Sequence, residues 1–176
     1  IKSGTRYIFR NYLLYNRLIL IILTKINSFR WRSIKLYVVI WPPAITFFEE
    51  IINDLSLQCN VLSFEKFVIN KKNFHNFLCC LYTIDNASQN KILTKVNRLQ
   101  VNANLMGLVL IEIKKPKMIA NDIFNYVKCT QVNSIKKGIR LKYKDKIENY
   151  IYDIIIHSTE VDYQNKKVED LILKYK

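Results

Sequence analysis

The chain has 176 residues, half of them hydrophobic, and it carries 28 Lys and Arg against 14 Asp and Glu, a formal net charge of +14. This length is enough for one compact hydrophobic core and too short for two domains of ordinary size. The excess of positive charge predicts an anionic partner, which would be a phosphorylated molecule, a nucleic acid or an anionic membrane surface.

The cysteines form neither a CxxC pair nor a spacing that matches a histidine, which argues against a zinc site and against a thioredoxin-like motif. The four are Cys59, Cys79, Cys80 and Cys129. The two histidines lie far apart in the sequence, so we expect no metal-binding cluster. A chain of this size without a disulfide framework is typical of a reducing compartment, which predicts a cytoplasmic location.

The most apolar segment is "YIFRNYLLYNRLILIILTKI", residues 7–26. Arg10, Asn16 and Arg17 interrupt it, and its longest uninterrupted apolar run covers only residues 18–23. A membrane span needs about 20 consecutive apolar residues. We therefore expect no transmembrane segment.

The same segment is predicted to be a helix with a broad apolar surface, because Arg10 and Arg17 are seven residues apart and lie on one side. We assign residues 1–33 to this N-terminal apolar helical segment and residues 34–176 to a single α+β domain. The apolar surface is expected to pack on that domain, on a protein partner or at a membrane interface, through Leu13, Leu14, Leu18 and Ile21.

From residue 34 onward, β-rich segments alternate with segments of helical periodicity. "IKLYVVIWPP" concentrates β-branched and aromatic residues and stops at two prolines, which cannot continue a strand. "AITFFEEIINDL" then repeats apolar residues at the spacing of one helix face. By the same criteria, strands are predicted near 36–41, 60–69, 107–113 and 150–156. Helices are predicted at 44–55, 70–84, 86–99, 134–151 and 165–175, with a short additional helix between Met118 and Val132.

The resulting order, β-α-β-α-β-α-β-α, predicts an α+β fold with one four-stranded antiparallel sheet. Helices segregated on one side of such a sheet give the split βαβ, ferredoxin-like arrangement. The sequence contains no internal repeat and no glycine-rich phosphate loop.

One histidine, His157, lies where the predicted strand 150–156 meets the polar residues Ser158, Thr159 and Glu160. A rigid strand end can present a side chain to a cleft, and an imidazole is neutral often enough at pH 7 to act as a nucleophile, a base or a metal ligand. The alternative is a strand-end histidine that only satisfies local hydrogen bonds.

The segment "IIIHSTE" resembles the active-site segment of the nucleoside diphosphate kinase family, which is usually written N-x-x-H-G-S-D. The resemblance implies that His157 accepts the phosphate, with Thr159 at the serine position and Glu160 at the aspartate position. Upstream, "GIRLKY" is similar to the family's segment containing G-T-I-R, which implies that Arg140 binds phosphate. Glu169 lies one residue beyond the place of the family's glutamate that orients the histidine.

"YVVIWPPAITFFEEIINDL" is similar to the family's first strand, K-P loop and helix, so the resemblance covers about residues 35–175. The chain departs from the family at Trp41, Ile154 and Ser158, which stand where the family has a phosphate-binding lysine, an asparagine and a glycine. Four lysines could supply positive charge near a phosphate in place of the missing one, or else form a solvated surface: Lys114, Lys115, Lys136 and Lys137. Mg²⁺ is implied as a cofactor by the resemblance alone.

The resemblance predicts a divergent nucleoside diphosphate kinase-like domain that binds a nucleotide or another phosphorylated small molecule. Whether phosphate is transferred through a phosphohistidine at His157 stays open, because Trp41 cannot supply the charge of a lysine. Two other functions also stay open. One is a noncatalytic interaction domain of a larger protein, and the other is a nucleic-acid-binding domain, to which the net charge and the 11 tyrosines point.

Overall fold

The computed structural model describes residues 32–84, 89–99, 105–121, 126–150 and 153–176. The predicted N-terminal helical segment, residues 1–33, lies almost wholly outside these ranges, so its packing stays a prediction. Within the described ranges, no helix combines the length and the apolar character that crossing a membrane would require.

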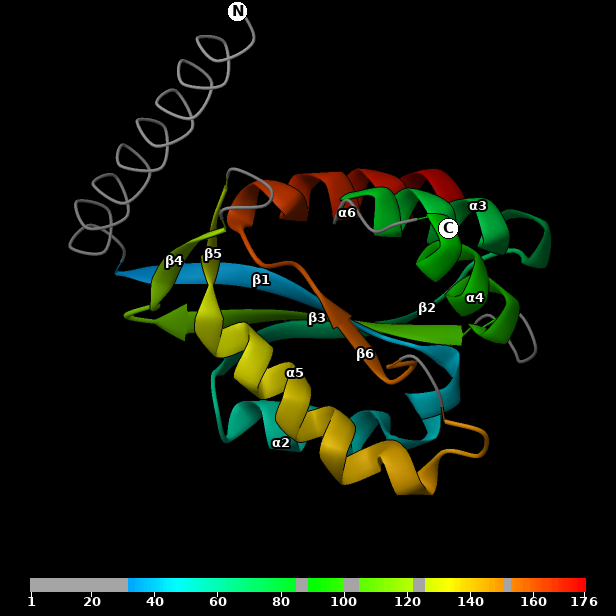
Figure 1. Ribbon diagram of the computed structural model, residues 1–176. Coiled ribbons are helices and arrows are strands. Elements are labelled where there is room, and N and C mark those ends of the chain that lie inside the picture. Colours follow the sequence, from blue (N-terminus) through cyan, green and yellow to red (C-terminus); the bar gives the residue numbers. More distant parts are fainter. Residues whose placement is uncertain (1–31, 85–88, 100–104, 122–125, 151–152) are drawn as a thin grey trace, which may run out of the picture.

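Four antiparallel strands form the main sheet, in the spatial order β2-β3-β1-β6 (Figure 1). They are β1 (Ser33–Ile40), β2 (Asn60–Val68), β3 (Leu105–Lys114) and β6 (Ile156–Ser158). In β1 and β3, residues pair from Ser33 opposite Lys114 to Ile40 opposite Gly107. Because β3 lies between β1 and β2, the strands joined by the first helix are not neighbours, which is the split βαβ order. The predicted α+β class with an antiparallel sheet is confirmed.

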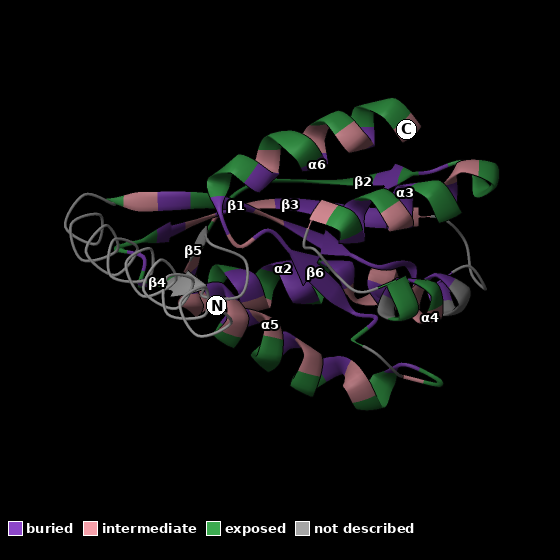
Figure 2. Cartoon of the chain, turned by 45° about the horizontal axis from the view of Figure 1, so that its top comes forward, coloured by how far each residue is buried: buried purple, intermediate pink, exposed green. Residues whose placement is uncertain are grey.

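Helices cover both faces of the sheet, rather than one side as predicted (Figure 1). α2 (Phe48–Ser56) and α5 (Thr130–Tyr143) lie on one face, and α3 (Lys71–Ile84), α4 (Gln89–Leu99) and α6 (Asp162–Tyr175) lie on the other. The physical reason is that β1 is apolar on both of its faces. Leu36, Val38 and Ile40 are buried on the α2 side, because Ile40 and Phe48 of α2 both lie against Gly107. Val39 is buried on the α3 side, because it is opposite His157, which contacts Tyr82 of α3. Figure 2 shows the buried residues of β1 in purple.

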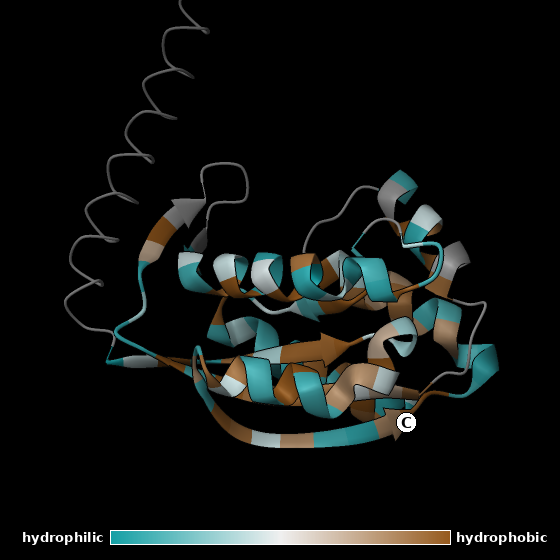
Figure 3. Cartoon of the chain, turned by 90° about the horizontal axis from the view of Figure 1, so that it is seen from below, coloured by the Kyte–Doolittle hydropathy of each residue, from teal (hydrophilic) through white to brown (hydrophobic). Residues whose placement is uncertain are grey.

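The connection from β1 to α2 follows from the two prolines and the apolar spacing that comes after them. Pro42 opens a 3-10 helix, η1 (Pro42–Phe47), which leads directly into α2. The side chains of α2 that face the sheet are Phe48, Ile51, Ile52 and Leu55, and all four are buried. Figure 3 shows this side of the molecule, where hydrophilic and hydrophobic residues alternate along the helices. The predicted strand-to-helix transition is confirmed.

Gly107 of β3 allows α2 to approach the sheet closely. A Cβ atom at this position would lie 2.6 Å from Cδ2 of Phe48 and 3.2 Å from Cβ of Ile40. Both neighbours are buried side chains that cannot move aside into solvent. The absence of a side chain at residue 107 therefore sets the position of Phe48 and of α2.

Between Met118 and Val132 the predicted short helix is wrong. The chain forms a hairpin of β4 (Met118–Asn121) and β5 (Tyr126–Cys129), in which Met118 pairs with Cys129. At the open end of the hairpin, the Thr130 N–H donates to the Lys117 carbonyl (2.9 Å), and α5 begins at Thr130. Strands of four residues are too short to give a clear period of two, which is why the sequence pattern was ambiguous there.

The last strand is also displaced from its prediction at 150–156. β6 consists of Ile156–Ser158, and Asn149 and Asp153, which precede it, are not extended, with φ values of 54° and 58°. α5 correspondingly ends at Tyr143, before the predicted end of the helix. His157 was predicted to follow the strand directly. It is instead the middle residue of β6.

Candidate functional site

The imidazole of His157 is packed between two aromatic side chains on the α3 side of the sheet. His157 pairs with Val39 of β1, which places both side chains on the same face. The ring centroid of His157 lies 5.4 Å from that of Tyr82 in α3, edge to face, and 6.1 Å from that of Trp41. Only 8% of His157 is exposed. Trp41 and Tyr82 also stack on each other, with centroids 5.9 Å apart.

The electrostatic environment keeps this histidine neutral. Burial lowers the pKa of His157 well below its ordinary value of 6.5, and the positive charges of Lys136, Lys95 and Arg140 lower it further. The three cations come from α4 and α5. A neutral imidazole surrounded by positive charge is the main electrostatic feature of this end of the sheet.

Arg140 and Lys136 are one turn apart on α5, which packs beside β6. Nη2 of Arg140 donates to the Ile156 carbonyl (2.9 Å), and Nη1 lies 3.3 Å from Oδ2 of Asp153. Lys136 Nζ lies 3.2 Å from Oε1 of Glu160. The structure thus brings two predicted phosphate-binding cations to the His157 region, and each is paired with an acidic side chain.

Thr159 and Glu169 contribute to the attachment of β1 to α6. The Thr159 hydroxyl accepts a hydrogen bond from the Tyr37 N–H (2.9 Å) and donates to Oδ1 of Asn165 (2.8 Å). The Tyr37 hydroxyl donates to Oε1 of Glu169 (2.6 Å). Burial, together with the nearby carboxylate of Glu169, raises the pKa of Tyr37 to about 12. Two predicted site residues, Thr159 and Glu169, therefore form hydrogen bonds that connect β1 to the segment around α6.

The other predicted lysines lie apart from His157. Lys114 pairs with Ser33 at the start of β1, whereas His157 pairs with Val39. Six residues of strand separate these positions, which is about 20 Å at the usual rise of a β-strand. Lys115 is the next residue along the chain, and Lys137 is exposed on α5. The structure therefore does not bring Lys114 and Lys115 to His157.

Three buried polar atoms at this end of the described chain have no hydrogen-bond partner among the described residues: Nε1 of Trp41, Nε of Arg140 and Oγ of Ser158. Trp41 and Ser158 are two of the positions at which the chain departs from the resembled family. Trp41 is fully buried, and its backbone N–H donates to the Ile155 carbonyl (2.9 Å).

Sequence reasoning missed two members of this region, Tyr82 and Lys95. Lys95 of α4 lies over the Tyr82 ring, with Nζ 4.9 Å from the ring centroid. Tyr82 continues an apolar helix face, and Lys95 resembles any surface lysine of an amphipathic helix. The predicted helix pair 70–84 and 86–99 was the only signal available, because it brings both residues to the same face of the sheet.

No family model matches the chain, and no curated protein matches it. Among solved structures, the chain is similar to the nucleoside diphosphate kinase of Aquifex aeolicus, with 9% identity and a TM-score of 0.49 over 82% of this chain and 99% of that one. It is also similar to the nucleoside-diphosphate kinase of Borrelia burgdorferi with bound vanadate and ADP, with 9% identity and a TM-score of 0.45 over 82% and 93% of the two chains.

A third similar structure is the nucleoside diphosphate kinase of Halobacterium salinarum in complex with CDP, at 10% identity and a TM-score of 0.42 over 78% of this chain and 85% of that one. All three similar structures are nucleoside diphosphate kinases, the family that the motif around His157 resembles. At these identities and TM-scores the similarity carries no conclusion about activity, which has to be argued from the residues themselves.

Proposed function

We propose that the chain is a nucleoside diphosphate kinase-like domain that binds a nucleotide or another phosphorylated ligand at the His157 end of the sheet, without transferring phosphate. The observation that carries the proposal is the buried Nε–H of Arg140, which has no acceptor among the described residues, beside a neutral imidazole in a cationic environment.

Nε of Arg140 is a donor only, so it requires an acceptor and cannot offer a lone pair. Leaving a buried donor unpaired costs about 1 to 3 kcal/mol, which a bound acceptor would recover. Phosphate oxygens are strong acceptors and pair well with guanidinium groups. The Arg140 side chain is 22% exposed and that of Asp153 is 51% exposed, so a phosphate that approaches from solvent can replace the Asp153 carboxylate on Arg140.

The proposal excludes phosphotransfer because of how His157 is covered. A neutral imidazole has the protonation state that a nucleophile needs, but in-line attack on a phosphoryl group also needs an open approach. The rings of Trp41 and Tyr82 pack against the imidazole. Trp41 also provides no charge to stabilise a transferring phosphoryl group.

Mg²⁺, which the resemblance implies, fits this region only as part of a ligand. Among the described residues, no cluster of three or more His, Cys, Asp or Glu side chains could hold a metal ion. The carboxylates of Glu160 and Asp153 are already paired with Lys136 and Arg140. A magnesium ion would therefore arrive on the phosphates of a nucleotide, and no step of the proposal depends on it.

Calorimetric titration with ADP and ATP, with and without Mg²⁺, tests whether the chain binds a nucleotide. We expect Arg140→Gln to weaken binding by about 1 to 3 kcal/mol, the scale of a charge-assisted hydrogen bond. Lys137→Gln is the matched control, because it removes the same charge from an exposed position on the same helix. No heat with any nucleotide, or equal weakening in both variants, would reject a site at Arg140.

Incubation with γ-labelled ATP, followed by an assay for acid-labile phosphohistidine, tests the proposal that the chain does not transfer phosphate. We expect no label on the wild-type chain. A label that appears on the wild type and is lost in His157→Ala would overturn this part of the proposal and restore the kinase-like alternative.

A second candidate function, a protein interaction domain, is favoured by the exposed strand β2. Within the described part of the chain, β2 pairs only with β3, and Leu62, Phe64 and Val68 are 40%, 52% and 55% exposed. An edge strand with exposed apolar side chains can pair with a strand of another chain. Phe64→Lys should abolish any concentration-dependent association seen by light scattering. If association is unchanged, the partner does not use β2. Nucleic-acid binding and a cytoplasmic location stay predictions.

A further inference from the structure

Two contacts of different kinds hold the guanidinium group of Arg140 beside β6. Nη2 donates to the backbone carbonyl of Ile156 (2.9 Å), which belongs to the strand and fixes the direction of the side chain. Nη1 lies 3.3 Å from Oδ2 of Asp153, and Nε is buried with no acceptor among the described residues. The carboxylate therefore contacts one amino group of Arg140 through one oxygen, and part of the hydrogen-bonding capacity of the guanidinium stays unused.

Asp153 is held in place for this contact by a neighbour in the chain. The Tyr150 hydroxyl donates to Oδ1 of Asp153 (3.0 Å), so the two carboxylate oxygens have different partners. Burial, together with the hydrogen bond to Asp153, raises the pKa of Tyr150 to about 12, and the hydroxyl is therefore protonated at neutral pH. The backbone of Asp153 has a φ of 58°, in the left-handed region that Asp and Asn adopt more readily than most other residues.

The contact between Asp153 and Arg140 is nevertheless easy to break. The Asp153 side chain is 51% exposed, so water solvates its carboxylate once it leaves the guanidinium. An ion pair with such an exposed partner adds little to stability. A carboxylate of the protein thus occupies Arg140 reversibly, at the group to which an anionic ligand would bind.

We propose that Asp153 is an internal competitor for Arg140, and that it restricts the site to ligands with a terminal phosphate group. This role rests on the binding of a phosphorylated ligand at Arg140 that is proposed above. A terminal phosphate carries about −1.5 to −2 charges at pH 7 and three acceptor oxygens, so it is attracted more strongly than a carboxylate. A phosphodiester carries a single charge, and it gains little by replacing the carboxylate of Asp153.

The ligand class that follows is a mononucleotide or another phosphate monoester. The phosphodiester backbone of a nucleic acid is excluded as a ligand of Arg140. Because the contact with Asp153 must be broken before any anion binds, competition lowers the affinity for every anion by the same factor. Removing the carboxylate should therefore tighten binding, which is opposite in sign to the effect of removing Arg140.

Calorimetric titration of the full chain with AMP and with cyclic AMP tests the proposal, because these compounds share a base and a sugar and differ in the charge of the phosphate. We expect the wild type to bind AMP roughly tenfold more tightly than cyclic AMP. Asp153→Asn should tighten the binding of both compounds by about fivefold, the effect of removing one partly exposed ion pair. Asparagine tolerates the left-handed φ and keeps an oxygen that can accept from Tyr150.

Asp145→Asn is the matched control for the loss of a negative charge. Asp145 is exposed in η2 (Lys144–Lys146), which directly follows α5, and it makes no ion pair within the described part of the chain. Its replacement should change the affinity for AMP by less than about twofold, because solvent and salt screen an exposed charge.

Tyr150→Phe tests how the carboxylate is positioned. Loss of the hydroxyl leaves Asp153 less firmly held, so the affinity for AMP should rise by about twofold. In the double variant with Asp153→Asn, the change at Tyr150 should add nothing, because it acts through the carboxylate. A gain that persists in the double variant would overturn the positioning role of Tyr150.

The outcomes separate the competition from the binding site. If the wild type binds AMP and Asp153→Asn binds it no more tightly than Asp145→Asn does, Asp153 is not a competitor, although the site at Arg140 stands. If only Asp153→Asn binds AMP, the competition is supported, and nucleotide binding by the wild-type chain is overturned. No binding by either would reject both. Equal affinity of the wild type for AMP and cyclic AMP would reject the selection for a terminal phosphate.

Discussion

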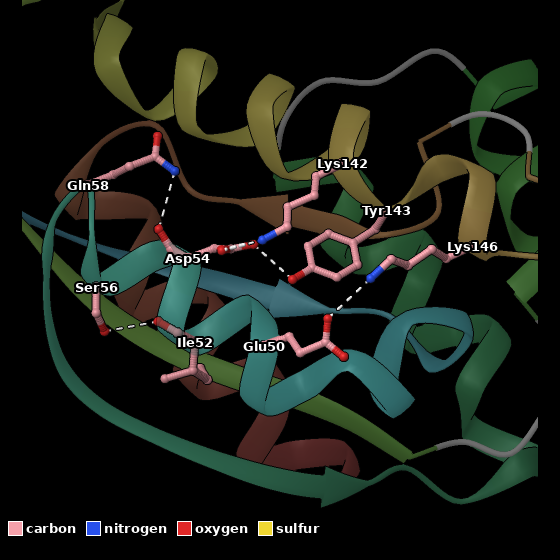
Figure 4. A network of polar contacts seen from close by, with 8 residues as sticks. All are labelled: Glu50, Ile52, Asp54, Ser56, Gln58, Lys142, Tyr143 and Lys146. Carbon is pink, nitrogen blue, oxygen red and sulfur yellow. Dashed lines mark hydrogen bonds and ion pairs between the residues drawn. The ribbon is translucent and has the colours of Figure 1, made fainter.

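Two regions of this molecule differ in how their polar groups are paired. Between α2 and α5, Asp54 accepts hydrogen bonds from Nζ of Lys142 (2.6 Å) and from the Tyr143 hydroxyl (2.8 Å), and Lys146 pairs with Glu50 (3.2 Å) (Figure 4). At the His157 end, three buried polar atoms have no partner among the described residues. The two regions differ in burial as well, because Lys142, Lys146 and Glu50 are exposed, whereas Trp41 and Ser158 are buried.

The contrast separates what holds the fold together from what is available to a ligand. At Asp54, burial favours the neutral acid, but the hydrogen bonds from Lys142 and Tyr143 outweigh it and lower the pKa. The polar network between α2 and α5 is thus complete without any ligand. At the His157 end, aromatic rings pack against one another, and the side-chain N–H groups of Trp41 and Arg140 have no acceptor among the described residues.

Replacing Trp41 should have the largest effect on stability. Its side chain is fully buried against Tyr82 and His157, so Trp41→Ala should lower the free energy of unfolding by about 3 to 5 kcal/mol. Trp41→Phe keeps a ring and removes the unpartnered Nε1, so it should recover most of that loss. Urea denaturation measures both variants. If the two lose the same stability, the Trp41 N–H has a partner and the contrast between the regions fails.

Asp54→Ala should have the next largest effect, because it leaves the buried Tyr143 hydroxyl without its acceptor. We expect a loss of about 1 to 3 kcal/mol in the free energy of unfolding. Tyr143→Phe should cost less, about 0.5 to 1.5 kcal/mol, because Asp54 keeps Lys142. A double-mutant cycle by urea denaturation gives the coupling of the two residues. Strictly additive losses would mean that the hydrogen bond contributes nothing.

The pH dependence of stability should distinguish the two regions. The folded-state pKa of His157 is lowered, so below pH 6.5 the unfolded chain binds a proton that the folded chain does not. Stability should therefore fall as the pH drops below 6.5, by up to about 1.4 kcal/mol per pH unit. The lowered pKa of Asp54 acts only at more acidic pH, since its ordinary value is 3.8.

Urea titrations between pH 4.5 and pH 7.5 measure this slope. His157→Gln should remove it. A slope that is unchanged in His157→Gln would come from other groups, and it would contradict the lowered pKa of His157.

Ser158→Ala should have the smallest effect. The Ser158 hydroxyl is buried and makes no hydrogen bond among the described residues, so its removal should change stability by no more than about 0.5 kcal/mol or increase it slightly. The measurement is again the urea midpoint, compared with that of Tyr143→Phe. A loss of about 1 kcal/mol or more would show that Ser158 has a partner, such as a bound water.

Sequence patterns predicted the long elements of the fold and failed for the short ones. β1, β3, α2 and the α3–α4 pair were predicted because each repeats its apolar residues over at least eight positions. The hairpin β4–β5 and the strand β6 have four residues or fewer per strand. For β6, the run of isoleucines before His157 did not show which residues would pair with β1, and the left-handed φ of Asp153 could not be read from composition.

The candidate site shows a similar limit. His157, Arg140 and Lys136 could be brought together because the histidine motif and the helix before it are close in sequence. Lys114 was misplaced because β3 runs antiparallel to β1, which puts its end beside the start of β1 and not beside β6. The pairing of the cations with Glu160 and Asp153 depends on side-chain geometry, which no spacing in the sequence records.

The strand order also determines when the sheet can form during synthesis. β1 and β2 are made first, but they do not pair with each other, and β3 pairs with both. A growing chain therefore carries two unpaired strands until β3 has been translated. Polypeptides released before residue 105 would lack the central strand of the sheet. Such products should aggregate or be degraded, whereas chains released after β3 could already assemble three strands.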